Sequence, residues 1–185
     1  MKPLLLSLAT FTAANLNAQP APPLLERLKD ENARGTDLWI YNNLQGAMAE
    51  AKRTGKPIFV TFRCVPYHAC KAFDAEMTKG QNVIRELAEK HFVSLRQVEM
   101  KGVDLSLFQF DYDLNWAAMF INADGVVYAR YGTPSAKGPD AYNSIAGLEA
   151  TMKRVLKLHA AYPANKTQLA GKRGGRKIRL DLPLQ

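Results

Sequence analysis

The run from Ile58 to Phe62, in which every residue is β-branched or aromatic, limits the fold of this chain more than any other segment. Side chains of a strand alternate between the two faces of a sheet, so a run that is apolar almost throughout is stable only when both faces are covered. Helices commonly provide that cover on both sides of a sheet. The run therefore predicts the central strand of a sheet that lies between two layers of helices.

An amphipathic helix is predicted on the amino-terminal side of this strand. Apolar residues recur at i, i+3, i+4 and i+7 between Leu44 and Ala51, which is the spacing of one helical face. Asn43 is a suitable N-cap residue, and Gly55 is a typical residue for the end of a helix.

A second amphipathic helix is predicted after the strand. It opens near Tyr67, and Cys70, Phe73 and Met77 form its apolar face. The charged residues of the same segment, among them Asp74, fall on the other side of the helix, which we expect to face solvent.

The rest of the pattern continues this alternation of helices and strands. We expect helical periodicity over 84–91, a strand over 92–98, a short helix and loop over 101–115, a hairpin of strands 117–121 and 126–131, and a final helix over 145–159. Strands interleaved with helices and followed by an antiparallel hairpin predict the α/β class: a three-layer α/β/α sandwich with a mixed central sheet.

The first residues are typical of an exported protein. Lys2 supplies a positive charge, an apolar stretch follows over 4–14, and small residues precede Gln19. The apolar stretch is shorter than the roughly 20 residues that span a bilayer, so we expect no transmembrane span. We expect a periplasmic or secreted protein with a signal peptide over 1–18, a linker over 19–36, one domain over 37–162 and a basic tail over 163–185.

Positive charge is concentrated in that tail. Of the net charge of +8, five units belong to residues 163–185, which hold six lysines and arginines against Asp181. Contact with an anionic surface is one interpretation, and a solvated tail that binds nothing is another. No nucleic-acid-binding module is visible, and we expect no nucleic-acid partner.

Taken in order, these elements resemble the thioredoxin superfamily, and in particular an exported subgroup of it. The resemblance spans residues 37–160 and rests on Trp39, the helix 44–51, Gly55-Lys56-Pro57, the strand 58–62, Cys70-Lys71 and the turn Asn122-Ala123-Asp124-Gly125. It implies a thioredoxin-like sandwich with a redox site where the central strand leads into the next helix.

The cysteine motif departs from the Cys-x-x-Cys site that this resemblance implies. If Cys70 matches the second cysteine, Tyr67 replaces the first, and a tyrosine hydroxyl cannot form a mixed disulfide. Cys64 is the only other cysteine of the chain. In an oxidising compartment Cys64 and Cys70 can pair if their geometry permits, and buried free thiols are the alternative.

If the two cysteines pair, redox chemistry remains possible. Cys70, in the first turn of a helix, would attack a partner disulfide, and Cys64 would resolve the mixed species, or the roles would be reversed. His68 in its charged form, or Arg63, would add to the stabilisation of the thiolate.

Two other positions differ from the pattern that the resemblance implies. Thr61 takes the place of a buried acid in the central strand. Trp116 or Ala117 takes the place of a cis-proline that faces the cysteines, and we expect a trans peptide there. The predicted groove for a protein or peptide partner consists of Tyr67, His68, Trp116 and Ala117.

Three functions therefore stay open. The first is thiol–disulfide redox chemistry through Cys64 and Cys70, and the second is a binding module without catalysis. The third is copper handling, because Cys64, His68 and Cys70 are soft ligands suited to Cu(I). His91 and His159 are interpreted as packed or capping histidines, and no other cofactor is expected.

Overall fold

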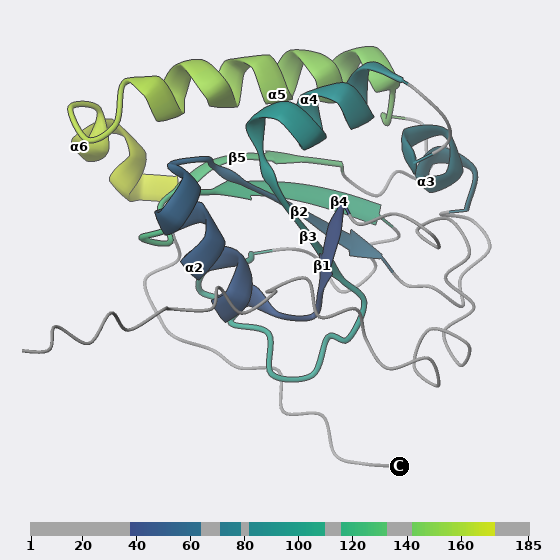
Figure 1. Ribbon diagram of the computed structural model, residues 1–185, viewed down its shortest axis with the longest axis horizontal. Helices are drawn as coiled ribbons and strands as arrows, with labels where there is room; N and C mark the ends of the chain where they lie inside the picture. The colour runs from purple at the N-terminus through teal and green to yellow at the C-terminus, as the bar shows by residue number, and fades with distance from the viewer. Residues whose placement is uncertain (1–37, 64–70, 79–81, 110–115, 133–141, 173–185) are drawn as a thin grey trace, which may run out of the picture.

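The computed structural model describes residues 38–63, 71–78, 82–109, 116–132 and 142–172, and the following account is confined to them. Their elements are shown in Figure 1: β1 (Trp39–Tyr41), α2 (Leu44–Thr54), β2 (Ile58–Arg63), α3 (Lys71–Thr78), α4 (Val83–His91), β3 (Val93–Gln97), β4 (Trp116–Ile121), β5 (Val127–Tyr131), α5 (Ile145–Ala160), α6 (Lys166–Leu169) and the 3₁₀ turn η3 (Ala170–Lys172).

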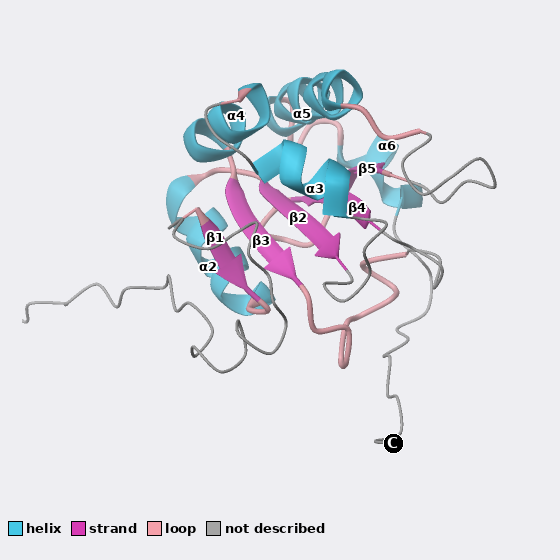
Figure 2. Ribbon diagram, turned by 90° about the vertical axis from the view of Figure 1, so that its right-hand side faces the viewer, coloured by secondary structure: helices cyan, strands magenta, loops and turns pink. Residues whose placement is uncertain are grey.

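The five strands form one mixed sheet in the order β1-β3-β2-β4-β5. Strand β2 lies in the middle, where it pairs in parallel with β3 and antiparallel with β4. Helix α2 packs against β2 and β3 on one face, whereas α4 and α5 cover the other face and α3 lies beside α4 (Figures 1 and 2). The predicted α/β sandwich with a mixed central sheet is therefore confirmed.

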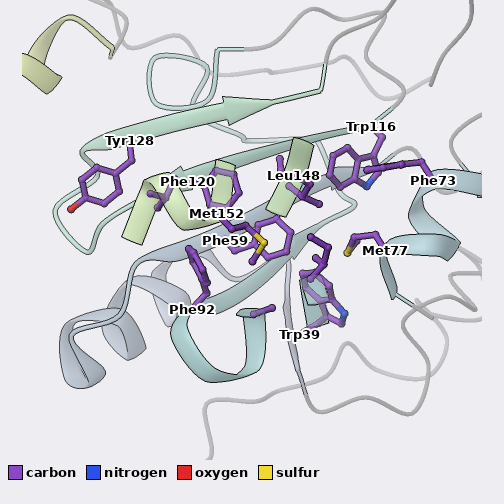
Figure 3. Close-up of a cluster of buried hydrophobic side chains, with 14 of the residues drawn as sticks. Trp39, Phe59, Phe73, Met77, Phe92, Trp116, Phe120, Tyr128, Leu148 and Met152 are labelled. Carbon is purple, nitrogen blue, oxygen red and sulfur yellow. The ribbon is translucent and has the colours of Figure 1, made fainter. Parts of the chain in front are cut away.

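Strand β2 is buried on both faces, as its sequence predicts. Ile58, Val60 and Phe62 belong to the apolar core beneath α2. Phe59 points the other way, into a larger core that is rich in aromatic residues. Figure 3 labels ten members of this larger core: Trp39, Phe59, Phe73, Met77, Phe92, Trp116, Phe120, Tyr128, Leu148 and Met152.

Helix α2 begins and ends where the sequence indicates. The side chain of Asn43 accepts a hydrogen bond from the backbone N–H of Gly46 at 2.8 Å. Gly55 ends the helix with φ of 68°, a left-handed conformation that glycine adopts without a Cβ clash. The N–H of Gly55 donates to the carbonyl of Ala51.

Three features differ from the sequence-based expectations or add to them. The short strand β1 has only three residues, too few to show periodicity, and it pairs in parallel with β3. Residues 101–108 form turns, and residues 110–115, the rest of the segment in which a short helix and loop is expected, lie outside the described residues. The folded part also continues past residue 162, because α6 places Leu169 in the larger core with 3% of its surface exposed. None of the helices within the described residues is both long and apolar enough to cross a membrane.

Candidate functional site

The predicted redox segment connects the central strand to α3. Strand β2 ends at Arg63 and α3 begins at Lys71. The four predicted site residues between them, Cys64, Tyr67, His68 and Cys70, lie outside the described residues. Their disulfide, copper and partner-groove roles therefore stay predictions, and the structure describes the elements from which this segment starts and to which it leads.

A buried charged cluster holds these elements together. The carboxylate of Asp74, from α3, accepts hydrogen bonds from Arg96 of β3 at 3.0 and 2.7 Å, one to each carboxylate oxygen. It also forms an ion pair with Arg63 of β2 at 2.7 Å, and the indole N–H of Trp116 donates to it at 3.3 Å. The exposed fractions of these four residues are between 0 and 3%.

Strand register explains why these residues meet. Thr61 lies opposite Arg96 in the parallel pair of β2 and β3, and Arg63 lies opposite Trp116 in the antiparallel pair of β2 and β4. Because residues two apart in a strand share a face, the two guanidinium groups project from one face of the sheet. The guanidinium of Arg96 also lies 5.5 Å from the centre of the Trp39 ring, a favourable distance for a cation–π contact.

The cluster fixes helix α3 to the carboxyl end of the central strand. A carboxylate and two guanidinium groups lose much hydration free energy when they are buried, and only close, well-directed hydrogen bonds offset that loss. The bonds to Asp74 have this quality because Arg96 is bidentate and Arg63 is a close third partner. As a result, the two residues that flank the segment 64–70 belong to elements whose relative positions are constrained.

Asp74 does not face solvent, contrary to the sequence-based expectation. Its side chain is completely buried. Residues 70, 73, 74 and 77 are spaced i, i+3, i+4 and i+7, so Asp74 belongs to the inward stripe of α3. The signal that predicts the burial of Asp74 lies in the strands. Arg63 and Arg96 occupy segments that must be buried, and a buried arginine needs a carboxylate.

Of the other positions singled out by the resemblance, Trp116 belongs to this cluster, and Thr61 lies opposite its member Arg96 in the sheet. Thr61 is fully buried, and its hydroxyl has no hydrogen-bond partner among the described residues. The buried carboxylate of the cluster belongs to Asp74 of α3. Trp116 is 1% and Ala117 is 4% exposed, and the peptide between them is trans. Trp116 packs edge-on against Phe73, with 4.7 Å between ring centres. The role of Trp116 and Ala117 in a partner groove stays a prediction.

Both ring nitrogens of His159 have hydrogen-bond partners within the fold. Its Nε2 lies 2.8 Å from the carbonyl oxygen of Gly55, which can only accept, so Nε2 carries the proton. In the neutral ring Nδ1 then accepts from the hydroxyl of Tyr128 at 2.9 Å. His91 is half-buried at the end of α4. Among the described residues there is no group of three His, Cys, Asp or Glu side chains that could hold a metal ion.

Tyr128 leads to a prediction about alkaline stability. Burial raises the pKa of Tyr128 to about 12, whereas an ordinary tyrosine titrates near pH 10. Between about pH 10 and pH 12 the folded protein thus keeps a proton that the unfolded chain has lost, and stability decreases as the pH rises. The free energy of unfolding decreases over this pH range, and we expect Tyr128→Phe to remove up to ~2.7 kcal/mol of that decrease. The measurement is urea unfolding between pH 9 and pH 12.

The matched control is Tyr142→Phe, because Tyr142 is 60% exposed. That variant should follow the wild-type pH profile. Parallel profiles for the wild type and Tyr128→Phe would contradict the role given to burial of the phenol.

The comparison with protein families agrees with the architecture. Residues 39–123 match the model of a family described as thioredoxin-like. Over these residues the chain is similar to thioredoxin-like proteins, and its mixed five-stranded sheet between helices has a thioredoxin-like arrangement. Among solved structures, it is similar to a disulphide isomerase from Xylella fastidiosa Temecula1, with 22% identity over 63% of this chain and 88% of that chain and a TM-score of 0.38. No curated protein matches the chain significantly.

Proposed function

We propose that this protein is an extracytoplasmic thiol–disulfide redox protein that uses Cys64 and Cys70. The observation that carries the proposal is the position of the two cysteines in the chain. Cys64 directly follows the last residue of β2, and Cys70 directly precedes the first residue of α3. In a thioredoxin-like protein this junction is the expected redox site, and here it holds both cysteines of the chain.

The environment of the junction supports the proposal electrostatically. Arg63, the neighbour of Cys64 in the sequence, is a member of the buried cluster, in which two guanidinium groups face one carboxylate. Positive charge near a cysteine favours the thiolate, which is the reactive form. The amide groups at the beginning of α3 favour negative charge at Cys70 in the same way.

The reaction proceeds in two exchanges. The Cys70 thiolate attacks a disulfide of a protein partner, forms a mixed disulfide and expels one partner sulfur as a thiolate. The Cys64 thiolate then attacks Cys70 in the mixed disulfide and expels the second partner sulfur. The partner gains two electrons and, once its thiolates are protonated, two protons, and Cys64–Cys70 becomes a disulfide. A thiol reductant restores the starting state.

The test measures the redox state and the activity of the purified full-length chain. We expect alkylation followed by mass spectrometry to find a disulfide that dithiothreitol reduces, and the reduced protein to accelerate reduction of insulin disulfides. A bridge over so short a loop adds only ~2 kcal/mol, so the domain should stay folded when it is reduced. Cys70→Ser should abolish the activity, and Cys64→Ser should accumulate the mixed disulfide at Cys70.

The matched control is Glu76→Gln, an exposed position on α3 that should keep full activity. Accumulation of the mixed disulfide in Cys70→Ser instead would reverse the two roles. Cysteines that stay free under oxidising conditions, or that no reductant reaches, would contradict the redox function. In that case, partner capture that survives Cys70→Ser would favour a binding module, and stoichiometric copper that is lost in Cys64→Ser would favour copper handling.

A further inference from the structure

A pocket lined by three cations is formed by elements that contain none of the predicted redox residues. It has a volume of about 440 Å³ and lies between β5, α5 and η3. Each element contributes one positive charge: Arg130 from β5, Arg154 from α5 and Lys172 from η3. The other residues that line it are neutral: Val127, Tyr128, Ala129, Thr151 and Gly171.

Hydrogen bonds hold two of the three cations in place. A terminal nitrogen of Arg130 donates to the carbonyl of Lys172 at 2.8 Å and to the side-chain oxygen of Gln109 at 3.1 Å. The ammonium group of Lys172 donates to the carbonyl of Tyr128, which uses one of its three hydrogens. Arg130 and Lys172 are therefore positioned before any ligand arrives, which lowers the entropy cost of binding.

The cations repel one another. Burial lowers the pKa of the Lys172 ammonium, and the charges of Arg154 and Arg130 lower it further. Arginine stays protonated, so this repulsion persists at neutral pH. Within the described part of the chain, Arg154 makes no ion pair, although its neighbour Lys153 pairs with Glu149 on the same helix at 2.5 Å. A negatively charged ligand would relieve the repulsion.

We propose that this pocket binds the phosphate or sulfate group of an anionic ligand. A tetrahedral oxyanion presents several acceptor oxygens, which matches donors that converge from three sides. The pocket is large enough for such a group and part of the molecule that carries it. This binding involves neither cysteine and does not depend on the proposed redox function.

The test is a calorimetric titration of the full-length chain with inorganic phosphate at constant ionic strength. Arg154→Gln should weaken phosphate binding at least about tenfold, since it removes one charge-assisted contact. Lys153→Gln is the matched control, because it removes the same charge from the adjacent residue outside the pocket, and it should change the affinity less than about twofold. Circular dichroism checks that both variants fold, which we expect because both side chains are exposed.

A second arm identifies the source of the anionic group. Phosphatidylglycerol vesicles are compared with phosphatidylcholine vesicles in a sedimentation assay with the same variants. Phosphate binding that is sensitive to Arg154→Gln supports a soluble ligand. Binding to phosphatidylglycerol vesicles that Arg154→Gln weakens and Lys153→Gln leaves unchanged supports a lipid headgroup. If both variants behave like the wild type in both arms, or lose binding equally, the proposal is overturned.

Discussion

Asp74→Asn is expected to destabilise the domain by about 3–5 kcal/mol, measured as the free energy of unfolding in urea. The variant keeps the shape of the side chain but removes its charge. Arg63 and Arg96 would then be buried beside a neutral amide that cannot replace the two-oxygen contact with Arg96. Breaking a buried ion pair in this way is costly because the remaining charges lose their partner without regaining water.

Glu76→Gln is the control for this prediction. It makes the same change from acid to amide in the same helix, at an exposed position, and should alter stability by less than about 0.5 kcal/mol. A loss below ~1 kcal/mol for Asp74→Asn would mean that the carboxylate does not hold α3 on the sheet. It would also remove the argument that the ends of the segment 64–70 are fixed by this cluster.

Phe59→Ala is expected to cost a similar amount, about 3–5 kcal/mol, for a different reason. Phe59 is completely buried at the centre of the aromatic core. Its ring is stacked on Phe120 with 5.3 Å between ring centres, and Trp39 and Phe92 lie at 5.8 and 6.3 Å (Figure 3). Removal of the ring forfeits its burial and leaves a cavity that the rigid sheet beneath it cannot fill.

The graded variant Phe59→Leu separates cavity formation from other causes. Leucine fills most of the space, so the loss of unfolding free energy should fall to about 1–2 kcal/mol. Equal losses for Leu and Ala would show that the specific ring contacts, and not the filled volume, determine the stability here. Both variants are measured by urea unfolding. The slope of the unfolding free energy against urea concentration should equal that of the wild type, which checks two-state behaviour.

The elements that could be predicted from the sequence are those with a strong local signal. The apolar run of β2 indicates its burial, and the capping residues Asn43 and Gly55 mark the ends of α2. Strand β1 and helix α6 carry no such signal because β1 has three residues and α6 four, too few for either pattern to repeat more than once. Their positions depend on tertiary contacts, such as the burial of Leu169.

The buried charged cluster of the candidate site was less predictable because its members come from four elements. The sequence separates Arg63, Asp74, Arg96 and Trp116, and only strand register and helix orientation bring them together. The helical period places Asp74 beside the stripe that Cys70, Phe73 and Met77 define, whereas its charge favours the solvent side, so the two signals conflict. The need of a buried arginine for a carboxylate resolves that ambiguity in physical terms.

The charged cluster of Asp74 has a consequence for protein engineering. Since the strand end at Arg63 and the first turn of α3 are joined through this carboxylate, the ion pair itself constrains the spacing of the two points between which residues 64–70 run. We therefore expect that exchange of those residues for other short peptides, with new reactive groups, retains the scaffold that presents them. The junction would then serve as an acceptor site for grafted loops.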